Sequence, residues 1–512
     1  MGIETEFPIM PLGILLAGKM YWTFAVVLVG YAALLLLISF VAQKRIKNVE
    51  DYVLAGRQLG TVLATITMIV TWFGAESLMT TTDEVAQHGL RKAMLDPIGI
   101  SMCLMIAGVF VAGPLWRMGL MTIPDFFRSR YGRLAELLSA CILVPSYFGW
   151  IAAQYLALAT LLDQFFGVPV SAGVIGVALL AMSYSMMGGM WSVTWTDVIQ
   201  MALIVLGLLI LGFEILWQLG DRSLSLGWSR LRFESEPAMW MIASGPDSKA
   251  KVMASISAVV IGALGNLPVQ DLMQRICSAV SDRVARRACL LAALGYLCMG
   301  MLPILAGLSA GQLLGTVPSD GVLTALAERL LSPALLLVFV LAVVSTVLST
   351  VVSAVLAPAA VLSQNLLQPL AQRFGLMRSE SSRLGMQRVS VMAIVAVSVS
   401  LALSGSDSYT LVESSYSLSL VGMFAGFAFG LYQQSVPRVS ALVSMVVGVG
   451  LWLLHVSLGW EYFLQPMVDR NSSIEFLKIL AVIPHELGDT LFSVVAFLIL
   501  WVIFGRGNRV NT

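Results

Sequence analysis

The chain has 512 residues, of which 58% are hydrophobic and only 12% are charged, and its mean hydropathy is +0.89. Soluble domains carry about 25% charged residues, so this chain lacks the polar side chains that would cover a water-facing surface. Apolar runs of about 20 residues recur along it, which indicates an all-α, polytopic membrane protein rather than a barrel. The net charge of +1 gives no reason to expect nucleic acid, and no segment points to an obligate protein partner; the lipid bilayer is the expected surrounding.

The apolar runs predict about 13 transmembrane helices. They cover residues 20–42, 61–82, 94–116, 135–162, 170–187, 195–218, 252–275, 288–314, 334–362, 388–404, 411–432, 440–458 and 487–505. Most of the 30 Lys and Arg residues then fall in connections on one side, among them Arg275 after the seventh span. The positive-inside rule therefore predicts an N-terminus outside and a C-terminus in the cytoplasm. The expected membrane is the plasma membrane, which is the inner membrane in a bacterium.

The second span contains an interruption where the bilayer should be driest. Residues 61–89 read TVLATITMIVTWFGAESLMTTTDEVAQHG, so Gly74 and Glu76 follow an apolar first half. A charge near the midplane costs about 2.5–3.5 kcal/mol on insertion scales, which makes it a functional candidate. We interpret this stretch as a broken helix that holds an ion and a solute; the alternative is a tightly packed helix with Glu76 near a membrane surface.

A second interruption lies in residues 251–275, where Gly265-Asn266-Leu267-Pro268 precedes Asp271. Paired breaks predict two five-helix units of opposite topology, with the substrate held where the first helix of each unit breaks. We therefore divide the chain into an N-terminal helix with its loop (1–60), a first repeat (61–218), an outer loop (219–251), a second repeat (252–432) and two C-terminal helices (433–512). The outer loop could carry a short surface helix, form part of an external gate or be a plain connector.

The ninth span carries a ladder of hydroxyl groups. Its members, at helical spacing, are Ser345, Thr346, Ser349, Thr350 and Ser353. Hydroxyl oxygens and freed carbonyls can surround Na⁺ without a fixed charge, so that the ion can bind and leave. The alternative is that each hydroxyl bonds back to its own helix or to a neighbouring one.

Four stretches resemble motifs of the sodium:solute symporter family. They are Glu50-Asp51-Tyr52-Val53-Leu54-Ala55-Gly56-Arg57, Thr122-Ile123-Pro124-Asp125-Phe126-Phe127 with Arg130-Tyr131-Gly132, Gly188-Gly189-Met190-Trp191 through Trp195-Thr196-Asp197-Val198-Ile199-Gln200, and Ala342-Val343-Val344-Ser345-Thr346. The resemblance spans about residues 45–435. It implies a five-plus-five inverted-repeat, leucine-transporter-like core whose members couple a Na⁺ gradient to solute uptake.

The resemblance also implies a sodium site. Its ligands would be the carbonyl groups of Val70, Phe73 and Ala342 together with the hydroxyls of Ser345 and Thr346. Asp197 matches an acid implicated in sodium coupling in relatives; the alternative is a structural ion pair or helix cap.

For the solute, the choline-carrier branch of the family is the most similar. Thr71-Trp72-Phe73-Gly74, Asp96-Pro97-Ile98-Gly99 and Pro268-Val269-Gln270 resemble its motifs, whereas Val269 replaces its tryptophan and Asp271 and Glu76 are additional acids. Quaternary ammonium groups bind aromatic faces, and acids suit an amino group, another organic cation or a proton. The predicted solute residues are Trp72, Glu76, Tyr147, Trp150, Gln270 and Asp271.

These observations predict a sodium-coupled symporter that imports a small polar solute, such as an amino acid or a choline-, betaine- or proline-like compound. The alternatives are a proton-coupled transporter and a membrane sensor with a transporter-like body. An enzyme is not expected, because the histidines His88, His455 and His485 form no zinc-protease motif and no Ser/His/Asp arrangement is legible.

Overall fold

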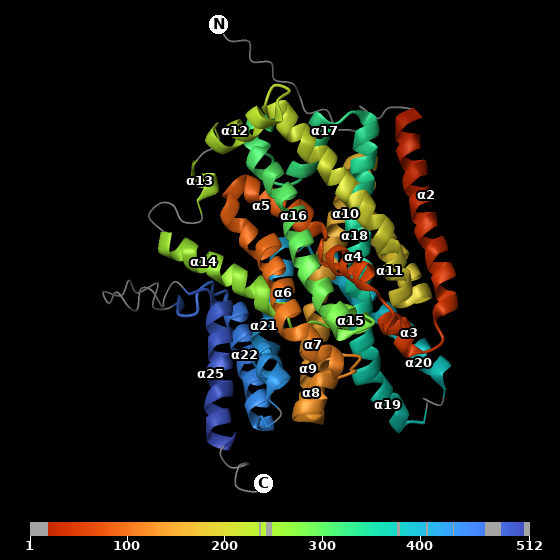
Figure 1. The fold of residues 1–512 in the computed structure, drawn as a ribbon, viewed down its shortest axis with the longest axis vertical. Coiled ribbons are helices and arrows are strands. Elements are labelled where there is room, and N and C mark those ends of the chain that lie inside the picture. The colour runs from red at the N-terminus through yellow and green to blue at the C-terminus, as the bar shows by residue number, and fades with distance from the viewer. Residues whose placement is uncertain are drawn as a thin grey trace.

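The computed structural model describes residues 19–234, 237–241, 248–375, 379–405, 408–433, 435–465 and 483–505 (Figure 1). The described residues form helices and contain no β-strand, only two isolated bridges. The first ten helices are α2 (Lys19–Ala42), α3 (Val49–Leu54), α4 (Thr61–Trp72), α5 (Thr81–His88), α6 (Ile100–Ile106), α7 (Ala112–Arg117), α8 (Ile123–Tyr131), α9 (Arg133–Ser146), α10 (Phe148–Phe166) and α11 (Val170–Leu219). The next twelve are α12 (Leu224–Glu234), α13 (Pro237–Trp240), α14 (Ser248–Val260), α15 (Gln270–Ser278), α16 (Asp282–Leu314), α17 (Val322–Leu330), α18 (Pro333–Val361), α19 (Gln368–Arg373), α20 (Glu380–Ala402), α21 (Ser408–Tyr432), α22 (Arg438–Leu458) and α25 (His485–Gly505).

In the described part of the chain, 11 helices are long and apolar enough to cross a membrane, and a bent pair makes up to 12. The longest, α11, contains two of the predicted spans. Gly189 divides it, because its φ of +49° and ψ of −142° are not helical. A Cβ at this position would lie 2.5 Å from the carbonyl oxygen of Tyr52, so the close approach also requires glycine. Every predicted span therefore falls on helical structure, and the predicted fold class is confirmed.

Both predicted interruptions are breaks in the structure. The first separates α4 from the π-helical turn η3 (Glu76–Thr80), which continues into α5, and the axis bends there by 66°. The second separates the π-helical turn η7 (Ile261–Gly265), at the end of α14, from α15. Residues 73–74 and 266–269 thus leave the regular helix inside the protein, where freed backbone groups need other partners.

The broken helices lie at the centre of the molecule. In Figure 1, α4 and α15 lie near mid-height, whereas α2 runs along the right edge and α22 and α25 form the lower left corner. Helix α4 packs against α11, α15, α16 and α18. Helix α21 packs against the helical turns at both breaks, and α10 packs against the turn at the first break. The two breaks therefore face one buried region rather than lipid.

The connection 219–251 carries two short helices, α12 and α13, in its described part. They lie at the top of Figure 1, together with α17. A Cβ on Gly89, which follows α5, would lie 2.7 Å from the carbonyl oxygen of Met239 on α13. The connection therefore packs directly onto the end of the first broken helix.

Candidate functional site

At the first break, the carbonyl group of Trp72 is freed from the helix and has three other hydrogen-bond donors nearby. The carbonyl oxygen of Trp72 accepts hydrogen bonds from the Gly74 amide at 3.0 Å, the Ser77 hydroxyl at 3.2 Å and the Tyr296 hydroxyl at 2.9 Å. Tyr296 and Ser77 also lie within hydrogen-bond distance of the buried carboxyl group of Asp96, at 2.9 Å and 2.7 Å. Asp96 thus fixes the two side chains that hold the break open.

A second carbonyl group of the same helix meets the hydroxyl ladder of α18. The carbonyl oxygen of Val70 accepts from Ser349 Oγ at 3.2 Å and from Thr350 Oγ1 at 3.4 Å. Ser349 also donates to the Thr346 carbonyl at 2.8 Å. This arrangement gathers main-chain and hydroxyl oxygens at the break, which are the ligands that hard monovalent cations use.

The predicted pair Ser345 and Thr346 lies one helical turn away from these contacts. Ser345 Oγ donates to the Leu341 carbonyl at 2.7 Å and lies 2.7 Å from the Tyr31 hydroxyl of α2, and Thr346 donates to the Ala342 carbonyl at 2.9 Å. Neither hydroxyl has a hydrogen bond to a carbonyl group of the break among the described residues, and their assignment as sodium ligands stays a prediction. Hydroxyls repeat at i and i+4 on one stripe of α18, so sequence alone could not select the turn that meets Val70.

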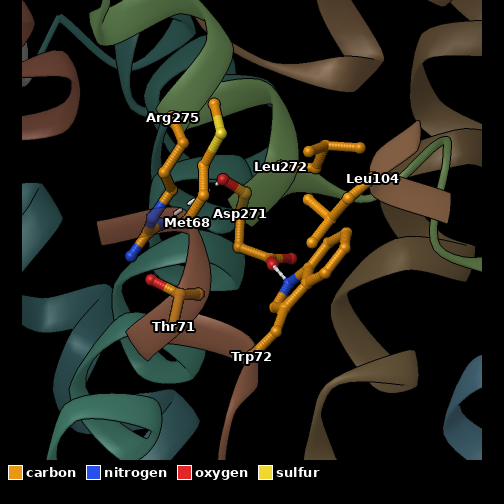
Figure 2. A pocket seen from close by; sticks show the side chains of 7 residues that line it. All are labelled: Met68, Thr71, Trp72, Leu104, Asp271, Leu272 and Arg275. Carbon is orange, nitrogen blue, oxygen red and sulfur yellow. Dashed lines mark hydrogen bonds between the residues drawn. The ribbon is translucent and has the colours of Figure 1, made fainter. Parts of the chain in front are cut away.

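The last hydroxyl of the ladder, that of Ser353, meets the buried Arg275, whose guanidinium lies near Thr71 in Figure 2. Arg275 Nη2 donates to Ser353 Oγ at 2.6 Å, and Thr71 Oγ1 donates to the same atom at 3.3 Å. The sequence predicts Arg275 in a connection, but its exposed fraction is 1%. Its position in the second broken helix, rather than after it, accounts for the difference.

Three of the predicted solute residues meet at the second break. The carboxylate of Asp271 accepts from the indole nitrogen of Trp72 on one oxygen and from the hydroxyl of Tyr147 on the other. Figure 2 shows Trp72 and Asp271 side by side, with Arg275 one helical turn further along α15. Asp271 thus links the two broken helices to the end of α9.

Glu76 and Trp150 meet at the first break. Trp150 Nε1 donates to Glu76 Oε1 at 2.8 Å, and the Gln154 amide nitrogen donates to the other carboxylate oxygen. The Gln154 carbonyl oxygen in turn accepts from the Ala75 amide at 2.8 Å. The carboxylate is therefore held against the break by two residues of α10, and Glu76 is buried in the protein with an exposed fraction of 4%.

Aromatic rings connect the two acids. The ring centroids of Tyr147 and Trp150 lie 5.9 Å apart, and those of Trp150 and Tyr416 lie 6.2 Å apart. Tyr416 of α21 lines two small cavities, one that reaches Asp271 and Asn266 and another that reaches Glu76, Asp96 and Lys92. Rings and carboxylates thus line one narrow region between the breaks.

Asp197 belongs to a separate cluster of polar residues that contacts α4 through Thr67. Thr67 Oγ1 donates to its Oδ2, whereas its Oδ1 has no hydrogen-bond partner among the described residues. The side chain of Gln200, one turn further along α11, is also buried. This carboxylate therefore retains an unused oxygen inside the protein.

Gln270 serves a different purpose from the one expected. Its Oε1 accepts from the Ile123 amide at 2.8 Å and its Nε2 donates to the Met121 carbonyl at 3.0 Å. Both polar ends of the side chain therefore hold the segment that precedes α8, and Gln270 is withdrawn from the predicted solute residues.

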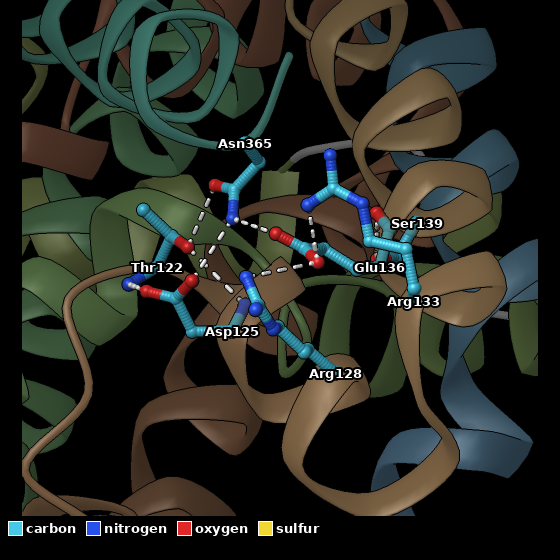
Figure 3. Close-up of polar contacts among 7 residues, drawn as sticks. All are labelled: Thr122, Asp125, Arg128, Arg133, Glu136, Ser139 and Asn365. Carbon is cyan, nitrogen blue, oxygen red and sulfur yellow. Dashed lines mark hydrogen bonds and ion pairs between the residues drawn. The ribbon is translucent and has the colours of Figure 1, made fainter. Parts of the chain in front are cut away.

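The motif around Thr122 forms a network that joins three helices (Figure 3). Asn365, in the π-helical turn η8 (Leu362–Leu367) after α18, donates to Asp125 Oδ1 at 2.9 Å and to Glu136 Oε1 at 3.0 Å, and accepts from Thr122 Oγ1 at 2.8 Å. Glu136, which is buried, also pairs with Arg133 at 2.8 Å. This network fastens α8 and α9 to the end of the helix that carries the hydroxyl ladder.

Acidic groups outnumber basic groups among the buried residues of the central region. The carboxyl groups of Glu76, Asp96, Asp197 and Asp271 and the guanidinium of Arg275 are each at most 5% exposed. Buried charges are stable only when they are paired or otherwise compensated. Since carboxyl groups outnumber the guanidinium, this region is suited to positively charged ligands.

Sequence reasoning missed several residues of this region. They are Asp96, Gln154, Tyr296, Arg275 and Tyr416, whereas Ser349 and Thr350 were named in the hydroxyl ladder but not among the predicted sodium ligands. Arg275 and Asp96 carried a usable signal, because an ionisable residue inside an apolar segment is a functional candidate. The remaining residues are ordinary polar or aromatic side chains, and only the packing of distant helices selects them.

The chain is thus a polytopic membrane protein with two broken helices around a buried, acidic and aromatic region. A model of the sodium:solute symporter family matches residues 52–448, so the chain belongs to this family. The sodium/proline symporter of Salmonella typhimurium is 23% identical over 464 residues, which cover 87% of this chain and 89% of that relative.

The human high affinity choline transporter 1 is 30% identical over 292 residues, or 55% of this chain. The matched part spans about half of the length of that relative, namely 49%. Among solved structures, a Na⁺-coupled sialic acid symporter in a substrate-bound outward-open state has a TM-score of 0.75, with 17% identity over 95% of this chain and 98% of that chain. A nucleobase-cation-symport-1 family transporter has a TM-score of 0.56 and 14% identity over 86% of this chain and 93% of that one. These similarities support the same overall fold.

Proposed function

We propose that this protein is a Na⁺-coupled symporter that imports a small solute bearing an amino or ammonium group. The observation that carries the proposal is the meeting of the Val70 carbonyl with the Ser349 and Thr350 hydroxyls at a helix break. A cation held there would bridge the first broken helix and α18, and would thereby couple ion binding to the geometry of the solute region. Each inward charge supplies about 2.3 kcal/mol per 100 mV of membrane potential.

The proposed sodium ligands are the carbonyl groups of Val70, Phe73 and Thr346 and the hydroxyls of Ser349 and Thr350. This set keeps the predicted carbonyls of the first helix and moves the α18 ligands by one turn. It replaces Ala342 and Ser345, and retains Thr346 through its carbonyl group alone. We keep Asp197 as a residue that acts in sodium coupling, because one of its buried oxygens is free to accept a cation or a proton.

The proposed solute region combines two acids with four rings. Asp271 and Glu76 would attract a positively charged nitrogen, and the faces of Trp72, Tyr147, Trp150 and Tyr416 would contribute roughly 0.5–2 kcal/mol per cation–π contact. The relatives support this chemistry, since choline carries a quaternary ammonium group and proline a secondary one. Choline, betaine and proline are therefore the solutes to test first.

The proposed arrangement places the N-terminus outside and the C-terminus in the cytoplasm of a plasma membrane, which is the inner membrane if the source is a bacterium. The two inverted repeats would cover 61–218 and 252–432, with 1–60, 219–251 and 433–512 outside them. In Figure 1, α2 begins near the top of the molecule and α25 ends at the bottom, which supports termini on opposite sides.

Purified protein in proteoliposomes tests this function. An inward Na⁺ gradient should drive accumulation of a labelled solute above the level reached with K⁺ in place of Na⁺. Uptake that ignores Na⁺ but follows a proton gradient would assign coupling to Glu76, Asp197 and Asp271 instead. Binding without uptake, measured as a solute-dependent rise in melting temperature, would favour a sensor.

A further inference from the structure

Two of the chain's three histidines meet outside the transport core. His455 lies near the end of α22, and His485 and Asp489 lie in the first two turns of α25. These helices pack against each other at the corner of the molecule opposite α2 (Figure 1). All three residues lie beyond residue 448, where the match to the family ends.

The three side chains bring potential ligand atoms close together. One potential ligand atom from each residue lies within 4.8 Å of the other two. Asp489 is central, since its Oδ1 lies 2.9 Å from His455 Nδ1 and its Oδ2 lies 3.5 Å from His485 Nδ1. His485 and Asp489 are four residues apart, so they occupy the same face of α25.

The contact between His455 and Asp489 is close but lacks the geometry of a hydrogen bond. His455 Nδ1 and Asp489 Oδ1 are both buried, and neither has a hydrogen-bond partner among the described residues. A buried carboxylate oxygen without a partner is costly. A metal ion bound by both atoms would satisfy them.

The surroundings also resemble the outer shell of a metal site. His485 Nε2, on the side of the ring away from Asp489, lies 3.1 Å from Glu486 Oε1. Metal-bound histidines usually donate their second N–H to a carboxylate, which fixes the ring and its tautomer. The His455 ring stacks on Trp460 at 5.4 Å, so its orientation is also fixed.

We propose that His455, His485 and Asp489 form a binding site for a divalent transition metal ion of the Zn²⁺ type. Two imidazole nitrogens and a carboxylate oxygen are zinc ligands, and a water molecule would complete a tetrahedral set. The ion would clamp α25 to α22 outside the helices that move a solute. The site escapes a sequence search because 29 residues separate the two histidines, and no short zinc motif exists.

Metal content and cobalt spectra test the site. The full-length protein is purified with a tag that contains no histidine, treated with EDTA, and dialysed against micromolar Zn²⁺ or Co²⁺. We expect one metal ion per chain by mass spectrometry and the visible absorption bands of tetrahedral Co²⁺. Absence of stoichiometric metal in the folded wild-type protein would overturn the proposal.

Variants assign the ion to these residues. H455A and D489N should each lose the stoichiometric metal and the Zn²⁺-dependent rise in melting temperature, since metal that binds only the folded state stabilises it. H88A removes the remaining histidine and should keep both. If a variant fails to fold, the wild-type Co²⁺ spectrum still decides. Equal metal content in H455A, D489N and H88A would show that the metal lies elsewhere, and Na⁺-driven uptake is a separate measurement that this result does not affect.

Discussion

At the scale of single residues, the position of the sodium ligands on α18 is the most specific claim. S349A or T350A removes one hydroxyl at the Val70 carbonyl. Interactions with charged groups contribute about 1.5–3 kcal/mol, so we expect the Na⁺ concentration for half-maximal uptake to rise about tenfold or more. The measurement is initial uptake rate against external Na⁺ in proteoliposomes.

Substitutions one turn earlier provide the matched control. S345A and T346A remove hydroxyls of the same helix that bond to Leu341 and Ala342. The Na⁺ dependence of these variants should remain within about twofold of the wild type, because neither substitution removes one of the proposed Na⁺ ligands. The opposite ranking of the two pairs would return the site to the register predicted from the sequence.

Asp271 is the residue whose charge we expect to matter most for the solute. D271N keeps the shape of the side chain but removes the charge that Trp72 and Tyr147 surround. The apparent affinity for a cationic solute should fall about tenfold or more, since a charged interaction of about 1.5–3 kcal/mol is lost. D282N, at a half-exposed ion pair with Arg117, is the control. Unchanged KM values in D271N would remove Asp271 from the solute region.

At the scale of elements, the first broken helix depends on Gly74. A Cβ there would lie 2.5 Å from Glu76 Oε2 and 2.9 Å from both Gln154 Oε1 and Thr350 Cγ2. G74A should therefore destabilise the native break by about 1–3 kcal/mol and abolish Na⁺-driven uptake. G60A, before the start of α4, meets no atom within 4 Å and should transport normally. Wild-type uptake by G74A would contradict the tight packing of the break.

The network of Figure 3 holds α8 and α9 to the end of α18. N365A removes the amide that serves Asp125, Glu136 and Thr122, and leaves buried oxygens unsatisfied. We expect a loss of about 1–3 kcal/mol of stability, detected as a lower melting temperature in detergent. Q364A is the neighbouring control, since its side-chain nitrogen has no hydrogen-bond partner among the described residues. Equal melting temperatures for N365A and Q364A would assign the network no structural role.

At the scale of the whole molecule, the proposed topology predicts the side on which each connection lies. Exposed Ser225 and Ser381 lie in the first turns of α12 and α20. In Figure 1, α12 lies at the top of the molecule, and α19, which precedes α20, lies at the bottom. In a background without the five native cysteines, S225C should react with an impermeant maleimide in intact cells. S381C should react only after the membrane is permeabilised. The reverse pattern would invert the proposed orientation.

The sequence by itself determined the architecture of this protein. Membrane spans, the two breaks and the family motifs follow from local order along the chain, because a helix in lipid satisfies its own backbone and any interruption is visible as glycine, proline or charge. Gly74, Glu76, Gly265 and Asp271 were therefore found without coordinates, and so were the aromatic residues Trp72, Tyr147 and Trp150.

Tertiary structure alone decided which partner each polar side chain meets. The turn of α18 that reaches Val70, the burial of Arg275 and the use of Gln270 by the segment before α8 depend on how distant helices rotate about their axes. The meeting of His455 with His485 and Asp489 depends on the same packing. Hydroxyls spaced i and i+4 look equivalent in sequence, and only contact with another helix makes them different.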